Sequence, residues 1–350
     1  MTRPVVILDP GWRQMDELFA PKTLRAICDQ FEVVWGKDGA IPPDVLDVAL
    51  QDAEVLIAAM PQVDEAVLAR APKLRMIIEV SGSFPGTIDY AACFARGVEV
   101  LSCAPGFRQS VAEMGLAMAL AGARGLVTEH EAFRAGRERW LADNPETDFT
   151  LFGATIGFIG FGQIAQEMGR LLAPFRPKLL AYDPWLPEAV AEAHHVTLLP
   201  LDEVLTASRC LFVTAIPTSE NYHLLNAARL ALVPDNALLV LLSRAHLVDF
   251  DALGAVLDQG RLRACIDVFP TEPVDADAPL RQSPGAILSP HRAAAVKGGR
   301  QLIGDMILSD LQASAAGRDD RQLARANAAT IAALAGVGDA EKVAMIAGQR

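Results

Sequence analysis

The sequence predicts an α/β protein with two doubly wound parallel sheets. Short apolar runs bounded by turn residues alternate with segments of helical periodicity, as in strands joined by crossover helices. This alternation occurs twice along 350 residues, of which 51% are hydrophobic, so each series has enough apolar side chains for its own core. A glycine-rich fingerprint, Gly160-Phe161-Gly162-Gln163-Ile164-Ala165, directly follows an apolar strand near the start of the second series.

The first series forms one α/β layer. Two helical segments, 44–50 and 64–69, each begin with an aspartate that can cap a helix N-terminus. The expected strands are Val5 to Leu8, Val55 to Ala58, Met76 to Val80 and Val98 to Leu101.

A long helical pattern from about Ser110 to Gly136 then connects the two series, and its length predicts a helix that bridges two domains. Beyond Gly317 an Ala-rich segment carries two helical patterns, and 331–350 is expected to be a helical tail without chemistry. The second series should contribute six strands, at 154–159, 178–182, 210–214, 237–242, 264–268 and 286–289.

Composition and charge exclude several classes of protein. A net charge of -12 without any basic cluster argues against nucleic-acid binding. The five cysteines are scattered and never in C-x-x-C spacing, and His194, His195 and His246 lack partners at ligand spacing, so neither disulfides nor a metal site is expected. No signal peptide or membrane-spanning run is apparent, and the protein is expected in the cytoplasm.

The fingerprint predicts a dinucleotide site. Gly160 permits a tight turn, Gly162 lets the backbone approach a pyrophosphate, and free N–H groups near Gln163 and Ile164 face the anion. Asp183, at the end of the next strand, is placed to hydrogen-bond a ribose 2′-hydroxyl. No arginine follows it to take a 2′-phosphate, so NAD is favoured over NADP.

Arg244, Glu272 and His291 follow later strands and carry the chemistry of a hydride-transfer site. A guanidinium can clamp a 2-oxo acid, a histidine can give a proton to its carbonyl oxygen, and a carboxylate can hold that histidine protonated.

From about residue 50 to 310 the chain resembles the D-isomer-specific 2-hydroxyacid dehydrogenases. The matching segments are Val111-Ala112-Glu113, the fingerprint with Tyr182-Asp183-Pro184, Ser243 to Asp249, Asp267 to Pro273, and Ser289-Pro290-His291. The resemblance implies a Rossmann NAD-binding domain, 113–295, inserted into a flavodoxin-like substrate domain, 1–112 and 296–330. It also implies a homodimer.

The resemblance further assigns roles. Arg244 would bind the substrate carboxylate and 2-oxo oxygen, His291 would be the acid and base, and Glu272 would orient it. Asp267 would contact the nicotinamide carboxamide and Pro217 would touch the cofactor.

The same resemblance assigns the substrate-binding residues of the first domain less specifically. Gly82 and Ser83 correspond to a loop whose backbone amides bind the substrate carboxylate, although the loop is one residue longer than usual. Ala245 replaces a common glycine and Ala215 a common histidine. Ala58-Ala59-Met60 lacks the arginine typical of phosphoglycerate-oxidising members, which favours an uncharged or apolar substituent lined by Met60 and Phe84.

Two alternatives remain open at this point. One is a regulatory relative that senses NAD(H) with little turnover, and the other is an unrelated Rossmann enzyme acting on an amino acid or a sugar.

Overall fold

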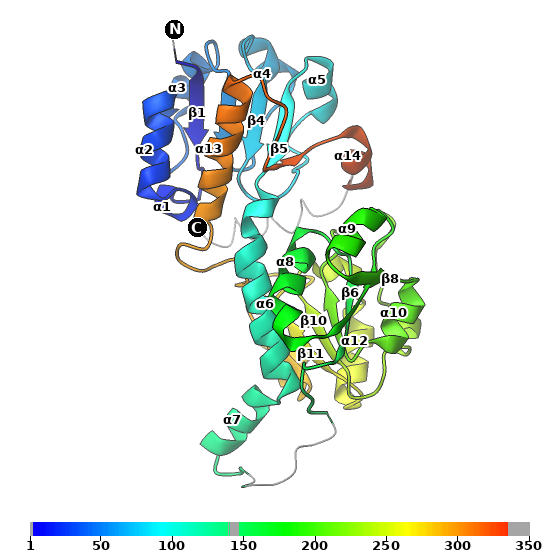
Figure 1. The fold of residues 1–350 in the computed structure, drawn as a ribbon. Helices are drawn as coiled ribbons and strands as arrows, with labels where there is room; N and C mark the ends of the chain where they lie inside the picture. Colours follow the sequence, from blue (N-terminus) through cyan, green and yellow to red (C-terminus); the bar gives the residue numbers. More distant parts are fainter. Residues whose placement is uncertain (1–2, 139, 141–146, 335–350) are drawn as a thin grey trace. The chain divides into compact units, whose positions relative to one another are not determined.

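A computed structural model describes residues 3–138, 140 and 147–334, and these form two units (Figure 1). Residues up to Arg108 and the returning segment from Val296 make up the first unit. Gln109–Ala295 makes up the second. The sequence-based prediction placed domain boundaries at 112/113 and 295/296, and the two units divide at 108/109 and 295/296.

The first unit contains a six-stranded sheet in the order β13-β5-β4-β3-β1-β2, in which only β13 is antiparallel to its neighbour. The order β2-β1-β3-β4-β5 is that of a flavodoxin-like sheet. Its strands are β1 (Val5–Asp9), β2 (Glu32–Trp35), β3 (Val55–Ala58), β4 (Met76–Glu79), β5 (Glu99–Ser102) and β13 (Ala324–Arg325). Its helices are α1 (Met15–Leu18), α2 (Pro21–Gln30), α3 (Pro43–Ala49), α4 (Glu65–Arg70), α5 (Tyr90–Ala95), η1 (Ala104–Phe107), α13 (Gln301–Ala315) and α14 (Ala328–Leu334).

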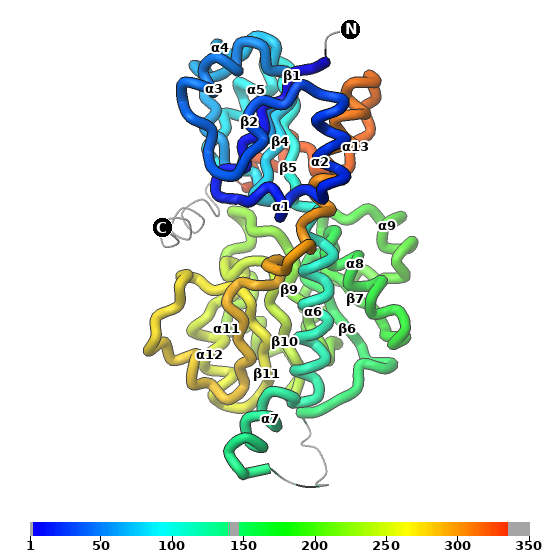
Figure 2. Tube along the Cα trace, turned by 90° about the vertical axis from the view of Figure 1, so that its left-hand side faces the viewer, coloured from blue at the N-terminus to red at the C-terminus, as the bar shows by residue number. Residues whose placement is uncertain are grey.

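Helix α13 closes the first unit after the chain returns from the second. It lies beside α1 and α2, as Figures 1 and 2 show, and its apolar face joins the core under β1 and β3. The approach is close at Gly304, where an added Cβ would lie 2.5 Å from the carbonyl oxygen of Leu18. Only a residue without a side chain fits between these helices.

The second unit contains a seven-stranded, fully parallel sheet in the order β12-β11-β10-β9-β6-β7-β8. Six of these strands give the Rossmann order, and β12 extends one edge. The strands are β6 (Thr155–Ile159), β7 (Lys178–Tyr182), β8 (Val196–Leu198), β9 (Cys210–Val213), β10 (Leu238–Leu241), β11 (Arg263–Ile266) and β12 (Ala286–Leu288). The helices are α6 (Arg108–Ala123), α7 (Leu126–Arg134), α8 (Gln163–Leu172), η2 (Ala173–Phe175), α9 (Glu188–Ala193), α10 (Leu201–Ala207), α11 (Ala227–Leu230), η3 (Ala245–Leu247), α12 (Phe250–Asp258) and η4 (Pro279–Gln282).

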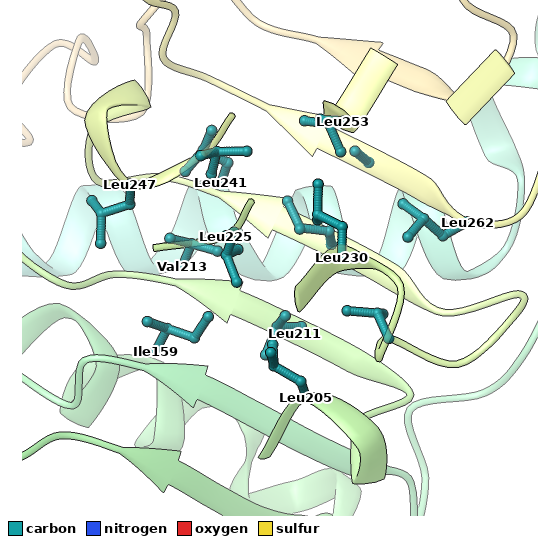
Figure 3. Packing of buried hydrophobic residues seen from close by; sticks show 14 of the residues in the cluster. Ile159, Leu205, Leu211, Val213, Leu225, Leu230, Leu241, Leu247, Leu253 and Leu262 are labelled. Atoms are coloured by element: carbon teal, nitrogen blue, oxygen red, sulfur yellow. The ribbon is translucent and has the colours of Figure 1, made fainter. Parts of the chain in front are cut away.

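Alternate residues of β10 serve the two faces of this sheet. Leu239 and Leu241 belong to a buried cluster with side chains from α10, α11 and α12, part of which Figure 3 shows. On the other face, Leu238 and Leu242 lie against α6, where Gly122 and Gly115 leave room for them. A sheet covered on both faces needs continuous apolar strands, which explains why β9 and β10 have no polar residue.

The structure corrects three expectations about elements. The expected long helix is two, α6 and α7, because Gly125 between them adopts φ +59°. Asp44 lies in the first turn of α3 rather than at its cap, whereas Asp64 caps α4 by accepting from the N–H of Val67. Strands β2, β8 and β13 were not expected. β8 and β13 are very short edge strands with little apolar patterning, whereas β2, also at an edge, contains the apolar run Val33-Val34-Trp35, which was missed.

The expected tail at 331–350 lies outside the described residues from 335 onward. No single helix in the described ranges is long and apolar enough to cross a membrane. One bent pair of helices, Ala104–Ala123 and Leu126–Arg134, reaches the necessary length and hydropathy only when the two helices are counted together.

Gly304→Ala should lower the free energy of unfolding by about 1–3 kcal/mol, because the new methyl group would overlap backbone atoms of α1. The matched control is Gly254→Ala in the interior of α12, where an added Cβ meets nothing within 4 Å and helix propensity should raise stability by roughly 0.5–1 kcal/mol. Denaturant titration of the two variants measures both effects, and equal stabilities would contradict this account of the α13 contact.

Candidate active site

The fingerprint glycines have different local requirements. Gly160 follows β6 with φ +82°, and an added Cβ would lie 2.4 Å from Cα of Ala215, so only glycine fits. Gly162 caps α8 in an extended conformation that any residue can adopt, and an added Cβ would meet nothing within 4 Å. The space beside Gly162 and the first N–H groups of α8 therefore suit the pyrophosphate of a dinucleotide.

Other residues predicted to bind the cofactor surround this turn. Gln163 is exposed and Ile164 half-buried at the start of α8, and Pro217 is half-buried in the loop after β9. Asp183 follows β7, and its carboxylate accepts from the N–H of Phe161 at 2.8 Å and from that of Trp185 at 3.0 Å. Asp183 thus also fixes the turn that carries the fingerprint.

Arg244, Glu272 and His291 come from three consecutive loops of the second unit. They follow β10, β11 and β12, which are neighbours in the sheet and run parallel. Because the carboxyl ends of parallel strands meet at one edge, residues 47 positions apart in the sequence (244 to 291) share one site.

His291 and Glu272 form a short hydrogen-bonded pair. Nδ1 of the imidazole lies 2.7 Å from Oε2 of Glu272, whose Oε1 accepts from the N–H of Phe269 at 2.9 Å. Burial raises the pKa of Glu272, but the hydrogen bond and charge of His291, the Phe269 amide and the charge of Arg244 outweigh it and bring that pKa below its ordinary value. Glu272 is therefore ionised at neutral pH, and the bond to Nδ1 directs the other ring nitrogen, Nε2, away from it.

Arg244 lies at the N-terminal end of η3, half-buried, with Nη1 donating to the carbonyl oxygen of Ser243 at 2.7 Å. Its charge acts on Glu272. A guanidinium, an imidazole and a carboxylate thus lie within electrostatic range, which suits binding of a small acid next to a proton donor.

Asp267 has a place that sequence reasoning did not foresee. Its carboxylate is fully buried and accepts from the Ser289 hydroxyl and from the N–H groups of Arg292 and Ala293, at 2.6 to 3.0 Å. Its carbonyl oxygen accepts from the N–H of His291, which adopts φ +49°. Asp267 therefore holds the loop that presents His291, while its contact with the nicotinamide carboxamide stays a prediction.

The residues predicted to bind substrate in the first unit lie at the carboxyl ends of β3 and β4. The N–H groups of Met60, Gly82 and Ser83 all donate to the carboxylate of Glu79, at 3.0 to 3.2 Å. Phe84, half-buried, packs edge-on against Tyr90.

Glu79 was missed at the sequence level and is fully buried. The signal was available: it is the one charged residue in the apolar run Met76 to Val80, and a buried carboxylate needs several donors. For metals, the described residues contain no group of three or more His, Cys, Asp or Glu side chains that could hold an ion.

Comparison with known proteins decides the family. The model of the D-isomer specific 2-hydroxyacid dehydrogenase, NAD binding domain, matches residues 116–293, which is half of the chain and most of the second unit. The chain belongs to this family. It is accordingly an NAD-dependent dehydrogenase acting on CH–OH groups, and the turn at Gly160–Gly162 fits the cofactor that the matching model names.

Relatives within the 2-hydroxyacid dehydrogenases differ in substrate. A glyoxylate reductase from Pyrococcus horikoshii is 29% identical over 82% of this chain and 88% of that protein. A D-3-phosphoglycerate dehydrogenase from Mycobacterium tuberculosis is 31% identical over 91% of this chain, which spans only 58% of that protein. Among solved structures, a phosphoglycerate oxidoreductase from Rhizobium etli has a TM-score of 0.82 and 35% identity, covering 93% of this chain and 99% of that one.

Gly162→Ala should leave thermal unfolding unchanged and weaken NADH binding at least about tenfold, because the added methyl group occupies open space where the pyrophosphate is expected. Titration of NADH fluorescence measures the affinity. Gly160→Ala is the contrasting variant, since it should destabilise the fold itself. Unchanged NADH affinity in Gly162→Ala would place the pyrophosphate elsewhere.

Proposed function

We propose that this dehydrogenase interconverts a D-2-hydroxy acid and its 2-oxo acid, with a small substrate such as glyoxylate or hydroxypyruvate, or one with an apolar substituent. The observation that carries the proposal is the grouping of Arg244, Glu272 and His291 after three neighbouring strands. A cation that can bind a carboxylate, beside a histidine hydrogen-bonded to a half-buried glutamate, suits proton transfer to the carbonyl oxygen of a 2-oxo acid.

The second unit would hold NAD with residues on one edge of its sheet. Gly160, Gly162, Gln163 and Ile164 would bind the pyrophosphate, and Asp183 the ribose. Pro217 and Asp267 complete the proposed contacts. When bound, the reduced cofactor supplies the hydride that reaches the carbonyl carbon of the substrate.

Arg244 would bind the substrate carboxylate and the 2-oxo oxygen through parallel N–H donors. His291 would then donate a proton from Nε2 to that oxygen as it becomes a hydroxyl, and take the proton back in the oxidative direction. Glu272 would keep the imidazole oriented through the hydrogen bond at Nδ1, since its own carboxylate stays ionised.

The side chains expected to face the substrate in the first unit favour a small or apolar substrate. Met60 and Phe84 are apolar, and 58–60 contains no cation for a phosphate group. The name of the Pyrococcus relative, glyoxylate reductase, agrees with a small substrate. Nothing in the site favours the regulatory alternative, because a protein that only senses NAD(H) has no need of the His291 and Glu272 pair.

We further propose a cytoplasmic homodimer. The five cysteines are all unpaired, which suits a reducing compartment. Leu126, Phe133 and Trp140, on and after α7, are exposed apolar side chains of the second unit, and a second copy of the chain is the expected cover. A monomer in light scattering at micromolar concentration would count against this assembly.

The function is tested by following NADH consumption with glyoxylate, hydroxypyruvate, pyruvate and branched or aromatic 2-oxo acids. At least one should be reduced, and Arg244→Ala should lower its kcat/KM by roughly 100-fold or more, because a charge-assisted contact is lost from the transition state. The affinity for NADH should hardly change. If NADH binding falls together with turnover, Arg244 is a cofactor residue, and if no 2-oxo acid is reduced the proposal fails.

Glu272→Gln should lower kcat/KM of the reductive reaction by roughly tenfold or more, because the imidazole of His291 loses the charged acceptor that orients it. Glutamine can still accept from the Phe269 amide, so the loop should keep its shape. The pKa of Glu272 is lowered in the folded protein. The stability that the ionised carboxylate contributes is therefore fully present at pH values above the ordinary pKa of a glutamate, and it is lost as the pH falls through the lowered pKa of the folded state. Equal values of kcat/KM for the two proteins would separate Glu272 from proton transfer.

A further inference from the structure

The amides of the loop Ser81–Ser83 are occupied by the chain itself. The carboxylate of Glu79 accepts from the N–H groups of Ser81 at 2.7 Å, Gly82 at 3.0 Å and Ser83 at 3.1 Å, and also from that of Met60 at 3.2 Å. Each of these backbone groups has only one hydrogen to donate. A substrate carboxylate at this loop therefore needs a donor other than these amides.

Arg13 lies beside the same loop, following β1 at the carboxyl edge of the first sheet. Its Nη2 is 3.5 Å from the carbonyl oxygen of Ser81, and its guanidinium carbon is 5.6 Å from the centre of the Phe107 ring. Phe107 also contacts the loop, because it lies where a side chain on Gly82 would be. Arg13 thus shares its surroundings with the residues expected to face the substrate.

The hydrogen-bonding capacity of Arg13 is poorly used. Its side chain is only 14% exposed, yet its closest carboxylate oxygen, Oε2 of Glu17, is 3.8 Å away. Its Nε is buried and has no hydrogen-bond partner among the described residues. A guanidinium has five N–H donors, and leaving them unmade in a buried place costs free energy.

The neighbours of Arg13 explain why Glu17 does not satisfy it. Oε2 of Glu17 is taken at 3.0 Å by Nη1 of Arg300, whose own Nε is also buried without a partner in the described part of the chain. Burial lowers the pKa of Arg13, the charge of Arg300 lowers it further, and Cys103, Glu17 and Glu79 act in the opposite direction. Two guanidinium groups therefore compete for one partly exposed carboxylate.

We propose that Arg13 is the first unit's contact with the substrate carboxylate, in place of the backbone amides that Glu79 occupies. This inference rests on the proposed function. A carboxylate would accept from the unused N–H groups of Arg13, while the Ser81 carbonyl and the Phe107 ring keep the guanidinium in place. Glu79 then holds the loop rather than leaving its amides for the ligand.

The test compares the full-length enzyme with Arg13→Gln and Arg13→Lys. KM and kcat are measured for glyoxylate and pyruvate, and binding of oxalate, an unreactive dicarboxylate analogue, is measured in the presence of NADH. Arg13→Gln should raise KM and the oxalate dissociation constant about 10- to 100-fold, with a smaller change in kcat and none in NADH affinity. Arg13→Lys should retain part of the oxalate affinity.

The matched control is Arg75→Gln. Arg75 is a partly buried arginine paired with Glu54 at 2.9 Å, and it precedes β4, at the opposite edge of the same sheet. The Arg75→Gln variant should keep the KM and the oxalate affinity of the wild type. Thermal unfolding of all variants reports whether the first unit is still folded. If the first unit of Arg13→Gln is not folded, the oxalate affinity of Arg13→Lys tests the proposal instead.

The outcomes separate the two proposals. A wild-type enzyme that reduces no 2-oxo acid contradicts the proposed function, while oxalate binding still reports on Arg13. If 2-oxo acids are reduced and Arg13→Gln and Arg13→Lys bind oxalate as the wild type does, only the role of Arg13 is overturned. A fall in kcat and stability with unchanged oxalate affinity would show that Arg13 merely supports the loop.

Discussion

The parallel alignment of β10, β11 and β12 is the constraint on which the site depends. β10 and most of β11 are buried, β12 is partly exposed at the edge of the sheet, and the direction of each strand is set by a crossover helix or loop that returns the chain to the same edge. The residues that follow these three strands therefore come together at the carboxyl ends of the strands, although no local sequence pattern links them. Arg244, Glu272 and His291 therefore come close together although they are far apart in the sequence.

Buried carboxylates hold the loops at these edges. Asp267 accepts three donors from the segment around His291, and Glu79 accepts four from the loops after β3 and β4. Asp310 does the same further from the site, accepting from the N–H groups of Gln322 and Leu323. A carboxylate buried in this way is stabilised only if all its acceptors are used, so each loop has one preferred conformation.

Much of this arrangement could be predicted from the sequence, because buried strands of four or five apolar residues leave a strong pattern. The fingerprint at Gly160 was predicted for that reason, whereas the candidate catalytic residues after β10 to β12 were predicted from the order of the motifs that the chain shares with the family. The edge strand β8 was missed because it is short and partly exposed, whereas β2 was missed although it contains the apolar run Val33-Val34-Trp35. Glu79, the partner of the Ser81–Ser83 amides, was also missed, although a single charged residue in the apolar run Met76 to Val80 indicates a buried carboxylate that needs donors. Which N–H groups donate to it depends on loop geometry, which residue types alone do not encode.

The insertion of one unit into the other has a consequence for biosynthesis. Within the described residues the second unit is the continuous stretch Gln109–Ala295, and it can assemble its sheet as soon as β12 has left the ribosome. Helix α13 of the first unit is translated only after the second unit. Until then the apolar side chains of β1 and β3 that α13 covers are exposed to solvent. The half that is translated first is thus the last to be completed, and its exposed core during that interval is where chaperone binding or aggregation would begin.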